Sequence, residues 1–375
     1  MMWRLLLFSG ATGGYIYLRV VAPLAWHKWG KAAAAVALAG VALRLPMLAL
    51  ISGGMYAPPL PAWVGIPYSC LFVAYIIWFC GVFGAQVLRG TALRGVGTWR
   101  RLAPAVQQRC FNRLHAGLLA VALLLSVCAT YCGLQEPEVR HLSLRCGLPQ
   151  PMRIALLTDL HVSAHHEPEK LRRLVRRTNE LGADIVCITG DFVDGSVAEC
   201  AEQMAPLSEL RAPLGVYGVP GNHDYYSGYE EWRAFLTAHG VRMLDNAHVA
   251  LPGGVILAGV TEETADKLPG MEPPNLHKAL LGVPTGAPVI LLSHRPDVAG
   301  EAAARGVALQ LSGHTHGGLV WGIGQLVALM NHGYLSGLYR LGGGAALYVS
   351  PGTGTGSRTP LRLGVPAELT DICLH

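Results

Sequence analysis

The sequence predicts an α-helical membrane region followed by a domain of the α/β class, and three observations support this division. Hydrophobic residues make up 51% of the 375 residues, and charged residues only 14%. None of the 24 acidic residues precedes Glu136, whereas 11 of the 29 Lys and Arg residues do. Strand-like runs alternate with helix-like segments only after this point. We therefore predict a membrane region over 1–135, a linker over 136–151 and a folded domain over 152–375.

The membrane region is predicted to contain about four transmembrane helices. The apolar stretches that predict them are Leu5–Ala25, Ala32–Ile51, Ala62–Leu88 and His115–Leu134. Each approaches or exceeds the roughly 20 residues that cross ~30 Å of hydrocarbon. Arg44 lies inside the second stretch and weakens that assignment, unless helix tilt or a partner accommodates its charge. These stretches predict an integral, multi-pass protein of the inner (plasma) membrane.

The basic residues between these stretches predict which side of the membrane the folded domain occupies. The first connection carries Lys28 and Lys31, and the second, over 52–61, carries no charge. The third connection carries Arg89, Arg94, Arg100, Arg101, Arg109 and Arg113. Because Lys and Arg accumulate in cytoplasmic loops, the folded domain is predicted on the extracytoplasmic side. The basic residues flank apolar stretches and do not cover one soluble face, so no nucleic-acid partner is predicted.

The folded domain alternates predicted strands with predicted helices. Strands are predicted at Met152–Leu157, Ile185–Ile188, Gly215–Val219, Val255–Gly259, Val289–Leu292, Ala308–Leu311 and Ala346–Val349. Helices are predicted at Pro168–Leu181, where a proline lies near the helix start, and near Ala198–Leu210. Alternation of this kind favours a layered α/β fold.

Five short polar clusters follow predicted strands of this domain. They are Asp159-Leu-His161, Gly190-Asp191, Gly221-Asn222-His223-Asp224, Ser293-His294 and Gly313-His314-Thr315-His316. Open α/β sheets bind ligands beyond the carboxyl ends of their strands, which is where these clusters lie. A two-metal hydrolytic centre needs a shared carboxylate and a set of nitrogen and oxygen donors. The clusters together predict such a centre.

The spacing within the clusters suggests how individual side chains contribute. Asp159 and His161 are separated by one residue, so an extended strand end points both to the same side. His314 and His316 share this spacing, between glycines that free the backbone. The two oxygens of Asp191 allow it to bridge two metals. Each pattern alone also fits an ordinary turn or a structural histidine, so the prediction rests on their combination.

The Gly-Asn-His-Asp cluster predicts the remaining roles. The side-chain carbonyl of Asn222 offers a neutral oxygen ligand for a second metal. The adjacent His223 cannot comfortably bind the same ion, so it is free to act as an acid at the phosphate or leaving group. Asp224 is expected to hold the His223 imidazole and raise its pKa. We therefore predict His223 and Asp224 as catalytic residues.

As a set, these motifs resemble the calcineurin-like metallophosphoesterase superfamily over residues 153–374. The resemblance implies a four-layer β-sandwich flanked by helices, with a dinuclear centre of Mn, Fe or Zn. One ion would take Asp159, His161, Asp191 and His316. The other would take Asp191, Asn222, His294 and His314, with His223 at the leaving group.

The details favour one branch of that superfamily. Protein Ser/Thr phosphatases usually carry Gly-Asp-x-x-Asp-Arg-Gly and Gly-Asn-His-Glu, whereas this chain has Gly195 after Asp194 and has Gly-Asn-His-Asp. It is more similar to the membrane-anchored bacterial phosphodiesterases, which include relatives resembling UDP-2,3-diacylglucosamine hydrolases. The tail from Leu347 to Pro366 also looks like that branch.

The resemblance implies hydrolysis of a phosphodiester or pyrophosphate by a hydroxide held between the two metals. The membrane stretches then predict a substrate at the bilayer, namely a phosphorylated lipid or a lipid-linked precursor. No protein partner is predicted. One alternative is an inactive metal-binding sensor or scaffold, although none of the ligand residues is missing. A nucleotide phosphodiesterase is the other alternative.

Overall fold

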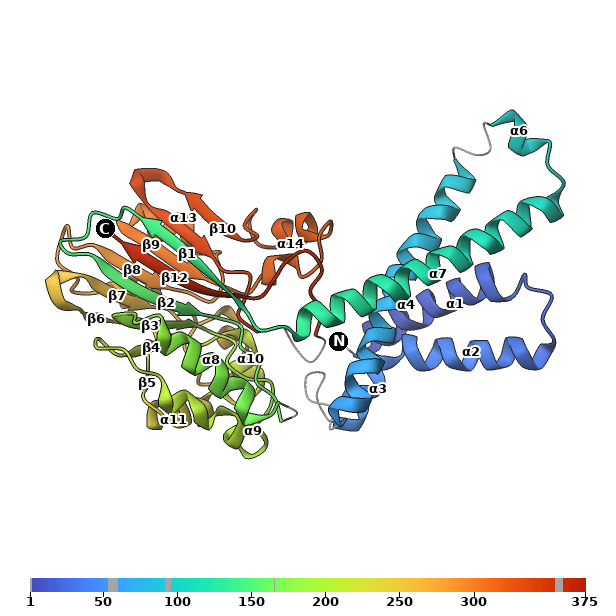
Figure 1. Cartoon of the computed structure of the whole chain (residues 1–375). Coiled ribbons are helices and arrows are strands. Elements are labelled where there is room, and N and C mark those ends of the chain that lie inside the picture. Colours follow the sequence, from blue (N-terminus) through green and yellow to red (C-terminus); the bar gives the residue numbers. More distant parts are fainter. Residues whose placement is uncertain (1, 53–59, 92–95, 165, 355–359) are drawn as a thin grey trace. The chain divides into compact units, whose positions relative to one another are not determined.

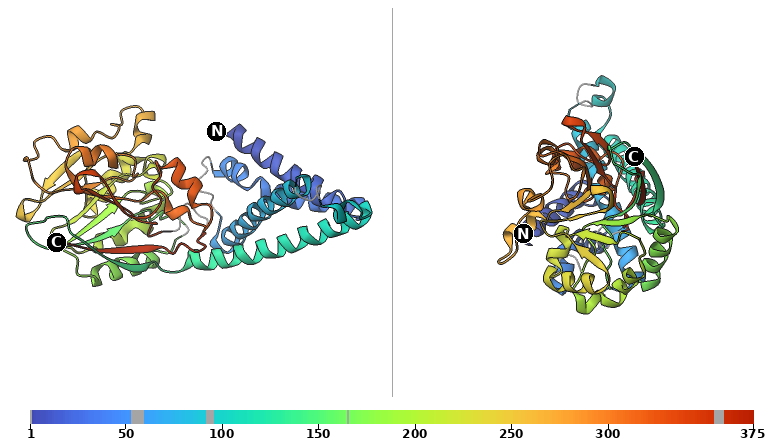
Figure 2. Two further views of the ribbon diagram at one scale, coloured as in Figure 1. Left: turned by 90° about the horizontal axis from the view of Figure 1, so that it is seen from above. Right: turned by 90° about the vertical axis from the view of Figure 1, so that its left-hand side faces the viewer.

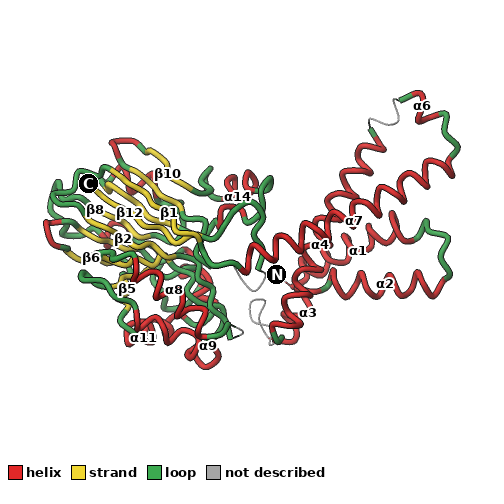
Figure 3. The backbone as a smooth tube through the Cα atoms, in the orientation of Figure 1, coloured by secondary structure: helices red, strands yellow, loops and turns green. Residues whose placement is uncertain are grey.

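The computed structural model describes residues 2–52, 60–91, 96–164, 166–354 and 360–375 (Figure 1). The chain divides into two compact units, over 1–130 and 131–375. Arg94 of the predicted third connection and part of the predicted second connection lie outside the described residues. Among the described residues, the first unit is helical and the second holds all of the strands (Figure 3).

Among the described residues, the first unit contains two helices that are long and apolar enough to cross a membrane. Its helices are α1 (Met2–Ile16), α2 (Lys28–Ala42), α3 (Arg44–Ser52), α4 (Ala62–Gly90), α6 (Gly97–Arg100) and α7 (Pro104–Leu134), whose last residues lie in the second unit. The two long helices are α4, with 29 residues, and α7, with 31. The bent pair α2 and α3 would be a third span if the pair crosses as one. The prediction of about four spans therefore stays a prediction.

The break between α2 and α3 explains how Arg44 is accommodated. The axes of α2 and α3 differ in direction by 63°. Pro46 has no N–H that could donate to the carbonyl of Ala42, and the missing hydrogen bond explains why α2 ends at Ala42. The Arg44 guanidinium donates to Ser69 Oγ at 2.6 Å. It also lies 5.4 Å from the centre of the Phe72 ring. The basic residue that weakened the second predicted span thus has polar and aromatic partners on α4.

The second unit is built on two six-stranded sheets. In the first sheet the order is β1 (Glu138–Leu144), β12 (Glu368–Leu374), β2 (Met152–Leu157), β3 (Ile185–Thr189), β4 (Val216–Val219) and β5 (Val241–Met243). In the second it is β10 (Gly337–Arg340), β11 (Ala346–Val349), β9 (Val307–Ser312), β8 (Val289–Leu292), β7 (Ile256–Gly259) and β6 (Ala247–Ala250). Strands β2 to β5 are parallel, as are β7, β8, β9 and β11. Parallel strands bring their carboxyl ends to one edge of each sheet.

Helices cover the outer faces of both sheets (Figures 1 and 2). The helices of this unit are α8 (Pro168–Glu180), α9 (Val197–Met204), α10 (Asn222–Tyr226), α11 (Tyr229–Ala238), α12 (Leu276–Ala279), α13 (Ala299–Ala304) and α14 (Gly324–Met330). One apolar core lies between the sheets, a second packs α8, α9 and α11 on the first sheet, and a third packs α12 and α13 on the second. This layering confirms the predicted four-layer sandwich.

The predicted linker over 136–151 contains a strand. Residues 138–144 form β1, which pairs in parallel with β12. Leu142 and Leu144 face the core between the sheets, whereas Val139 packs toward the helices. Because β1 is an edge strand with one exposed side, charged residues lie between its apolar positions. These residues hide the alternation of apolar and polar side chains that would otherwise predict a strand. The strands at Met152–Leu157 and Val289–Leu292 coincide with their predicted bounds.

Candidate metal centre

The structure brings all seven predicted metal ligands together beyond the carboxyl ends of parallel strands from both sheets. They are Asp159 and His161 after β2, Asp191 after β3, Asn222 after β4, His294 after β8, and His314 and His316 after β9. The last two are partly exposed and the other five are buried. Residues from five strands of two sheets thus converge on one place.

The first ligand group consists of Asp159, His161 and His316, whose ligand atoms lie within 4.8 Å of one another. His316 Nε2 lies 3.2 Å from His161 Nε2 and 3.5 Å from Asp159 Oδ1. His161 Nε2 also lies 3.5 Å from Asp191 Oδ2. We call these three residues the Asp159 group.

The second ligand group consists of His294 and His314, whose ligand atoms lie within 4.8 Å of each other and of Asp191, and we call it the His294 group. The further predicted ligand Asn222 follows β4 at the same edge of the sheet. His294 Nε2 lies 3.2 Å from His314 Nδ1 and 3.3 Å from Asp191 Oδ2. The same oxygen of Asp191 therefore faces a histidine of each group. This is the position that a carboxylate needs in order to bridge two cations.

The donor atoms of both groups fit divalent cations. The buried side-chain oxygen Oδ1 of Asn222 has no hydrogen-bond partner among the described residues. Buried polar atoms normally have a partner, and an unpaired oxygen in a loop whose flanking residues Gly221 and His223 contact Asp191 is suited to a cation. His294 Nδ1 lies 2.8 Å from the carbonyl oxygen of Thr189, to which it donates when Nε2 is the metal ligand.

The backbone of the ligand loops is held in a conformation that L-residues seldom adopt. The ligands with positive φ are Asp159 (53°), His161 (46°), Asp191 (53°), His314 (70°) and His316 (49°). Such a residue costs about 1–3 kcal/mol, and clusters of them mark functional sites. The surrounding fold therefore holds these side chains in place at some cost to stability.

Two glycines let the ligand loops approach one another closely. A Cβ atom on Gly221 would lie 2.2 Å from Asp191 Oδ1, and one on Gly313 would lie 2.3 Å from Asp159 Oδ2. The backbone N–H of His314 donates to both oxygens of Asp159 at 3.1 Å, which joins a loop of the second sheet to a ligand of the first. Any side chain at either glycine would push a ligand carboxylate away.

Before a metal binds, each group pairs a histidine of raised pKa with one of lowered pKa. Burial alone would lower the pKa of His161 and His294, but the neighbouring carboxylates outweigh it and raise these values to about 9 and about 10. Burial, together with a neighbouring cationic histidine, lowers the pKa of His314 to about 2 and that of His316 well below its usual value. One ring in each group is therefore protonated at neutral pH and the other carries a free electron pair.

Comparison with known proteins identifies the family. The model of the family described as calcineurin-like phosphoesterase matches residues 152–318. A Danio rerio protein named "Transmembrane protein with metallophosphoesterase domain" is 34% identical over 331 residues, which cover 84% of this chain and 74% of that protein. The chain belongs to the calcineurin-like metallophosphoesterase family.

Other relatives agree with this assignment. A Bos taurus protein with the same name is 32% identical over a region that covers 83% of this chain and 73% of that protein. An "Uncharacterized metallophosphoesterase" of Helicobacter pylori strain J99 is 35% identical over 64% of each chain. This metallophosphoesterase is therefore a metal-dependent phosphoester hydrolase that associates with a membrane. The finer resemblance to UDP-2,3-diacylglucosamine hydrolases stays a prediction.

Asp194 supports the centre of this metallophosphoesterase, and the sequence did not reveal that role. Its Oδ1 lies 3.1 Å from His161 Nδ1 and 2.5 Å from His223 Nδ1. Burial would raise the pKa of Asp194, but the two imidazoles hold it below its usual range. The only signal in the sequence is an acid three residues after Asp191. Asp194 therefore orients a ligand and the predicted acid together.

Asp224 has a different place from the one predicted. Its carboxylate accepts hydrogen bonds from the backbone N–H groups of Asp191 at 3.0 Å, Phe192 at 2.9 Å and Gly221 at 2.8 Å. Burial and the nearby Asp191 raise the pKa of Asp224 to about 7. The carboxylate joins the loops after β3 and β4, while the hydrogen bond to the His223 ring comes from Asp194. Asp224 is thus a positioning residue, and the expectation that it orients His223 is corrected.

A buried arginine in the tail fixes a further loop over the centre. Arg362 is fully buried and donates to the carbonyls of Pro351 at 2.9 Å, Gly352 at 3.0 Å and also Gly354. Burial lowers its pKa to about 10. The loop that it holds returns to the ligands, because the Gly354 N–H donates to the carbonyl of Asp159 at 3.0 Å. Sequence reasoning assigned no role to this residue.

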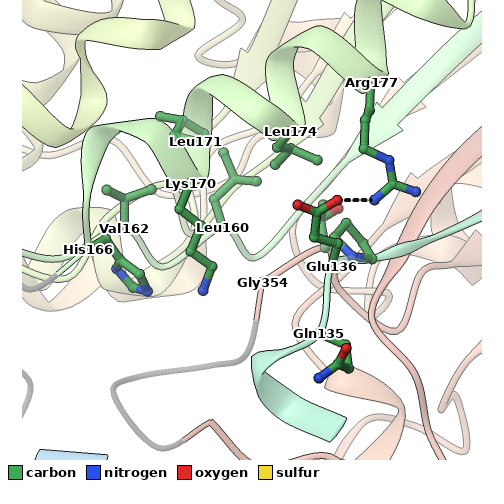
Figure 4. Close-up of a pocket in the computed structure, with 12 residues that line it drawn as sticks. Gln135, Glu136, Leu160, Val162, His166, Lys170, Leu171, Leu174, Arg177 and Gly354 are labelled. Carbon is green, nitrogen blue, oxygen red and sulfur yellow. Dashed lines mark hydrogen bonds and ion pairs between the residues drawn. The ribbon is translucent and has the colours of Figure 1, made fainter. Parts of the chain in front are cut away.

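A pocket adjoins the loop that carries Asp159 and His161 (Figure 4). It encloses about 600 Å³, its open mouth included. Its apolar lining comes from Leu160, Val162, Leu171 and Leu174. The polar ends of Lys170 and His166 lie together beside these side chains. Lys170 Nζ has no acceptor among the described residues, and burial lowers its pKa.

Proposed function

We propose that this metallophosphoesterase hydrolyses a phosphodiester or pyrophosphate of a membrane lipid or lipid-linked precursor, using two divalent ions such as Mn, Fe or Zn. The observation that carries the substrate class is the short connection between α7 and β1. Only Gln135–Pro137 separates the end of α7 from the start of β1. Because α7 is apolar enough to cross a bilayer, the catalytic domain is held at the membrane surface.

The distribution of positive residues along the chain supports a position of the catalytic domain on the extracytoplasmic side of the inner membrane. The six arginines of the sequence between Leu88 and His115 lie in and around the connection from α4 to α7. Positive residues favour the cytoplasm, which puts the carboxyl end of α7 on the other side. This argument depends on α4 and α7 alone, so it holds for any number of earlier spans.

The pocket beside the ligand loop supports an amphiphilic substrate. Its leucine and valine side chains suit a hydrocarbon chain, while the ammonium of Lys170 suits an anionic group. One residue that lines the pocket, Leu160, lies in the chain between the predicted ligands Asp159 and His161. A lipid phosphate at the centre would have apolar space within one loop of the reacting atoms.

The residues of the site fit in-line hydrolysis. Bound divalent ions would activate water and neutralise charge on the phosphoryl oxygens. His223 contributes a proton to the departing oxygen, and Asp194 orients its ring by accepting a hydrogen bond from Nδ1. Asp224 joins the loop that carries Asp191 to the loop that carries His223 through backbone hydrogen bonds.

The full chain in nanodiscs provides the test. We would measure hydrolysis of an aryl phosphodiester, an aryl phosphomonoester and a fluorescent phosphatidylglycerol after chelation and after addition of Mn²⁺. Metal-dependent cleavage of the lipid, lost in Asp191→Asn, is the expected result. Cleavage of the aryl diester without the lipid would contradict the substrate class. No turnover of any ester by a folded, metal-loaded protein would favour the sensor or scaffold alternative.

A further inference from the structure

An apolar surface projects from the catalytic domain directly after the last two metal ligands. Its side chains are Trp321, Ile323, Leu326, Leu329 and Met330, which are 83%, 48%, 64%, 79% and 81% exposed. They lie on α14 and on the turn before it (Figures 1 and 3). We call these five residues the α14 surface. Contiguous exposed apolar patches of this kind mark sites of protein or membrane contact.

The composition of this segment suits hydrocarbon and an interface with lipid headgroups. No Asp, Glu, Lys or Arg lies between Arg305 and Arg340 in the sequence. A protein-binding surface usually has charged residues at its rim, whereas the centre of a bilayer excludes them. Tryptophan is enriched at the boundary between lipid and water, and Trp321 is the most exposed side chain of the set.

The α14 surface is rigidly tied to the metal ligands. The 3₁₀ turn η5 (His316–Gly318) leads into it within a few residues. A Cβ atom on Gly318 would lie only 2.7 Å from the Cα atom of Gly324, so the start of α14 packs tightly on this turn. The backbone N–H of Trp321 donates to the carbonyl of Leu363 at 2.8 Å. The surface therefore cannot move far without moving His316.

The occupant that these observations favour is the bilayer that anchors the chain. The three residues between α7 and β1 keep the catalytic domain within reach of that bilayer at every moment. A short tether of this kind raises the effective concentration of the second contact to the order of mM. A free soluble partner would have to compete with a lipid surface that is always present.

We propose that the α14 surface inserts into the lipid surface next to the anchoring helices and thereby holds the metal centre over the lipid headgroups. The proposal rests on the proposed function only for its catalytic consequence, since membrane insertion itself requires no turnover. A substrate phosphate in the bilayer would then meet the ligands with little displacement from the membrane. A soluble ester would gain nothing from this contact.

Insertion is tested by fluorescence of the full chain in vesicles that contain phospholipids with brominated acyl chains. Bromine quenches tryptophan on contact, and comparison with Trp321→Phe isolates the contribution of Trp321 among the eight tryptophans. We expect a quenched component that Trp321→Phe lacks and that Leu326→Asp with Leu329→Asp abolishes. Leu281→Asp is the matched control, because Leu281 is 66% exposed in the same domain but lies outside the α14 surface.

Activity gives a second readout on the same variants. The double Asp variant should cleave vesicle-embedded phosphatidylglycerol at least tenfold more slowly, with its rate on the aryl phosphodiester unchanged, and Leu281→Asp should alter neither rate. A lack of lipid turnover in every variant would count against the proposed substrate and leave the quenching test intact. The insertion proposal is overturned if Trp321 is not quenched, whether it then lies in water or is covered by a second copy that cross-links as a dimer.

Discussion

The two ligand groups use the same kinds of donor but are supported in different ways. In the Asp159 group, the second nitrogen of His161 faces the carboxylate of Asp194, which also contacts His223. In the His294 group, the second nitrogen of His294 faces the backbone carbonyl of Thr189. The first group is therefore coupled to the predicted acid through one side chain. In the second group the acceptor for His294 Nδ1 is a backbone carbonyl, so a side-chain substitution at Thr189 does not remove it.

Asp191 is the residue that the two groups share, and its replacement should have the largest effect. Asp191→Asn removes the anionic oxygen that faces both His161 and His294. We expect loss of metal from both groups and a fall in activity of roughly 10³-fold or more, measured by metal analysis and aryl diester hydrolysis. Asp266→Asn, at an exposed carboxylate, is the control and should change neither. Retention of one metal with activity intact would contradict the shared role.

His223 should separate chemistry from metal binding. His223→Gln removes the proton donor while keeping all seven ligands. The rate should fall by roughly 10²- to 10⁴-fold with metal content unchanged. The effect should be smaller for an aryl ester with an acidic leaving group than for a lipid, because a good leaving group needs less protonation. Equal losses on both esters would argue against an acid role.

Asp194 should distinguish the two groups directly. Asp194→Asn removes the charge that supports His161 and His223, whereas the acceptor for His294 Nδ1 is the carbonyl of Thr189. The metal affinity of the Asp159 group should fall by about 10- to 100-fold, while that of the His294 group stays within about twofold. Sequential metal titration can resolve the two steps. Equal weakening of both would show that the groups are not independently supported.

Protonation should oppose metal binding to a similar extent in both groups. With pKa values raised to about 9 and about 10, His161 and His294 are protonated at pH 7 and must lose these protons to become ligands. We expect release of about two protons for two metals at pH 7, and affinity that falls as pH decreases. Calorimetry in buffers of different ionisation enthalpy counts these protons. Release of none would contradict the raised values.

The sequence predicted that these residues lie together because each follows a buried strand and has a short polar signature; their role as ligands stays a prediction. His294 after β8 and His314 after β9 are examples, since the parallel order of these strands dictates that their ends meet. The role of Asp194 was missed because it depends on where two distant rings point. The same holds for Arg362, whose acceptors are formed by a loop that folds back over Asp159.

Most strands inside the sheets were predicted from the sequence, whereas the edge strand β1 was not. β2 was predicted from an apolar run that is buried on both faces. β1 was assigned to a linker because an edge strand mixes charged and apolar residues, and its pairing with β12 joins residues more than 200 positions apart. The segment of α14 is apolar enough to suggest core, yet Leu326, Leu329 and Met330 are exposed. Composition alone cannot distinguish burial in protein from contact with lipid.

The most direct test of the account is metal stoichiometry measured together with activity on the full chain. Stepwise addition of Mn²⁺ to the chelated protein should show two bound ions per chain, with hydrolysis returning only as the second ion binds. In Asp191→Asn, both steps should be lost. Full activity at one ion per chain, or two ions bound by Asp191→Asn, would contradict a centre in which one carboxylate joins two ligand groups.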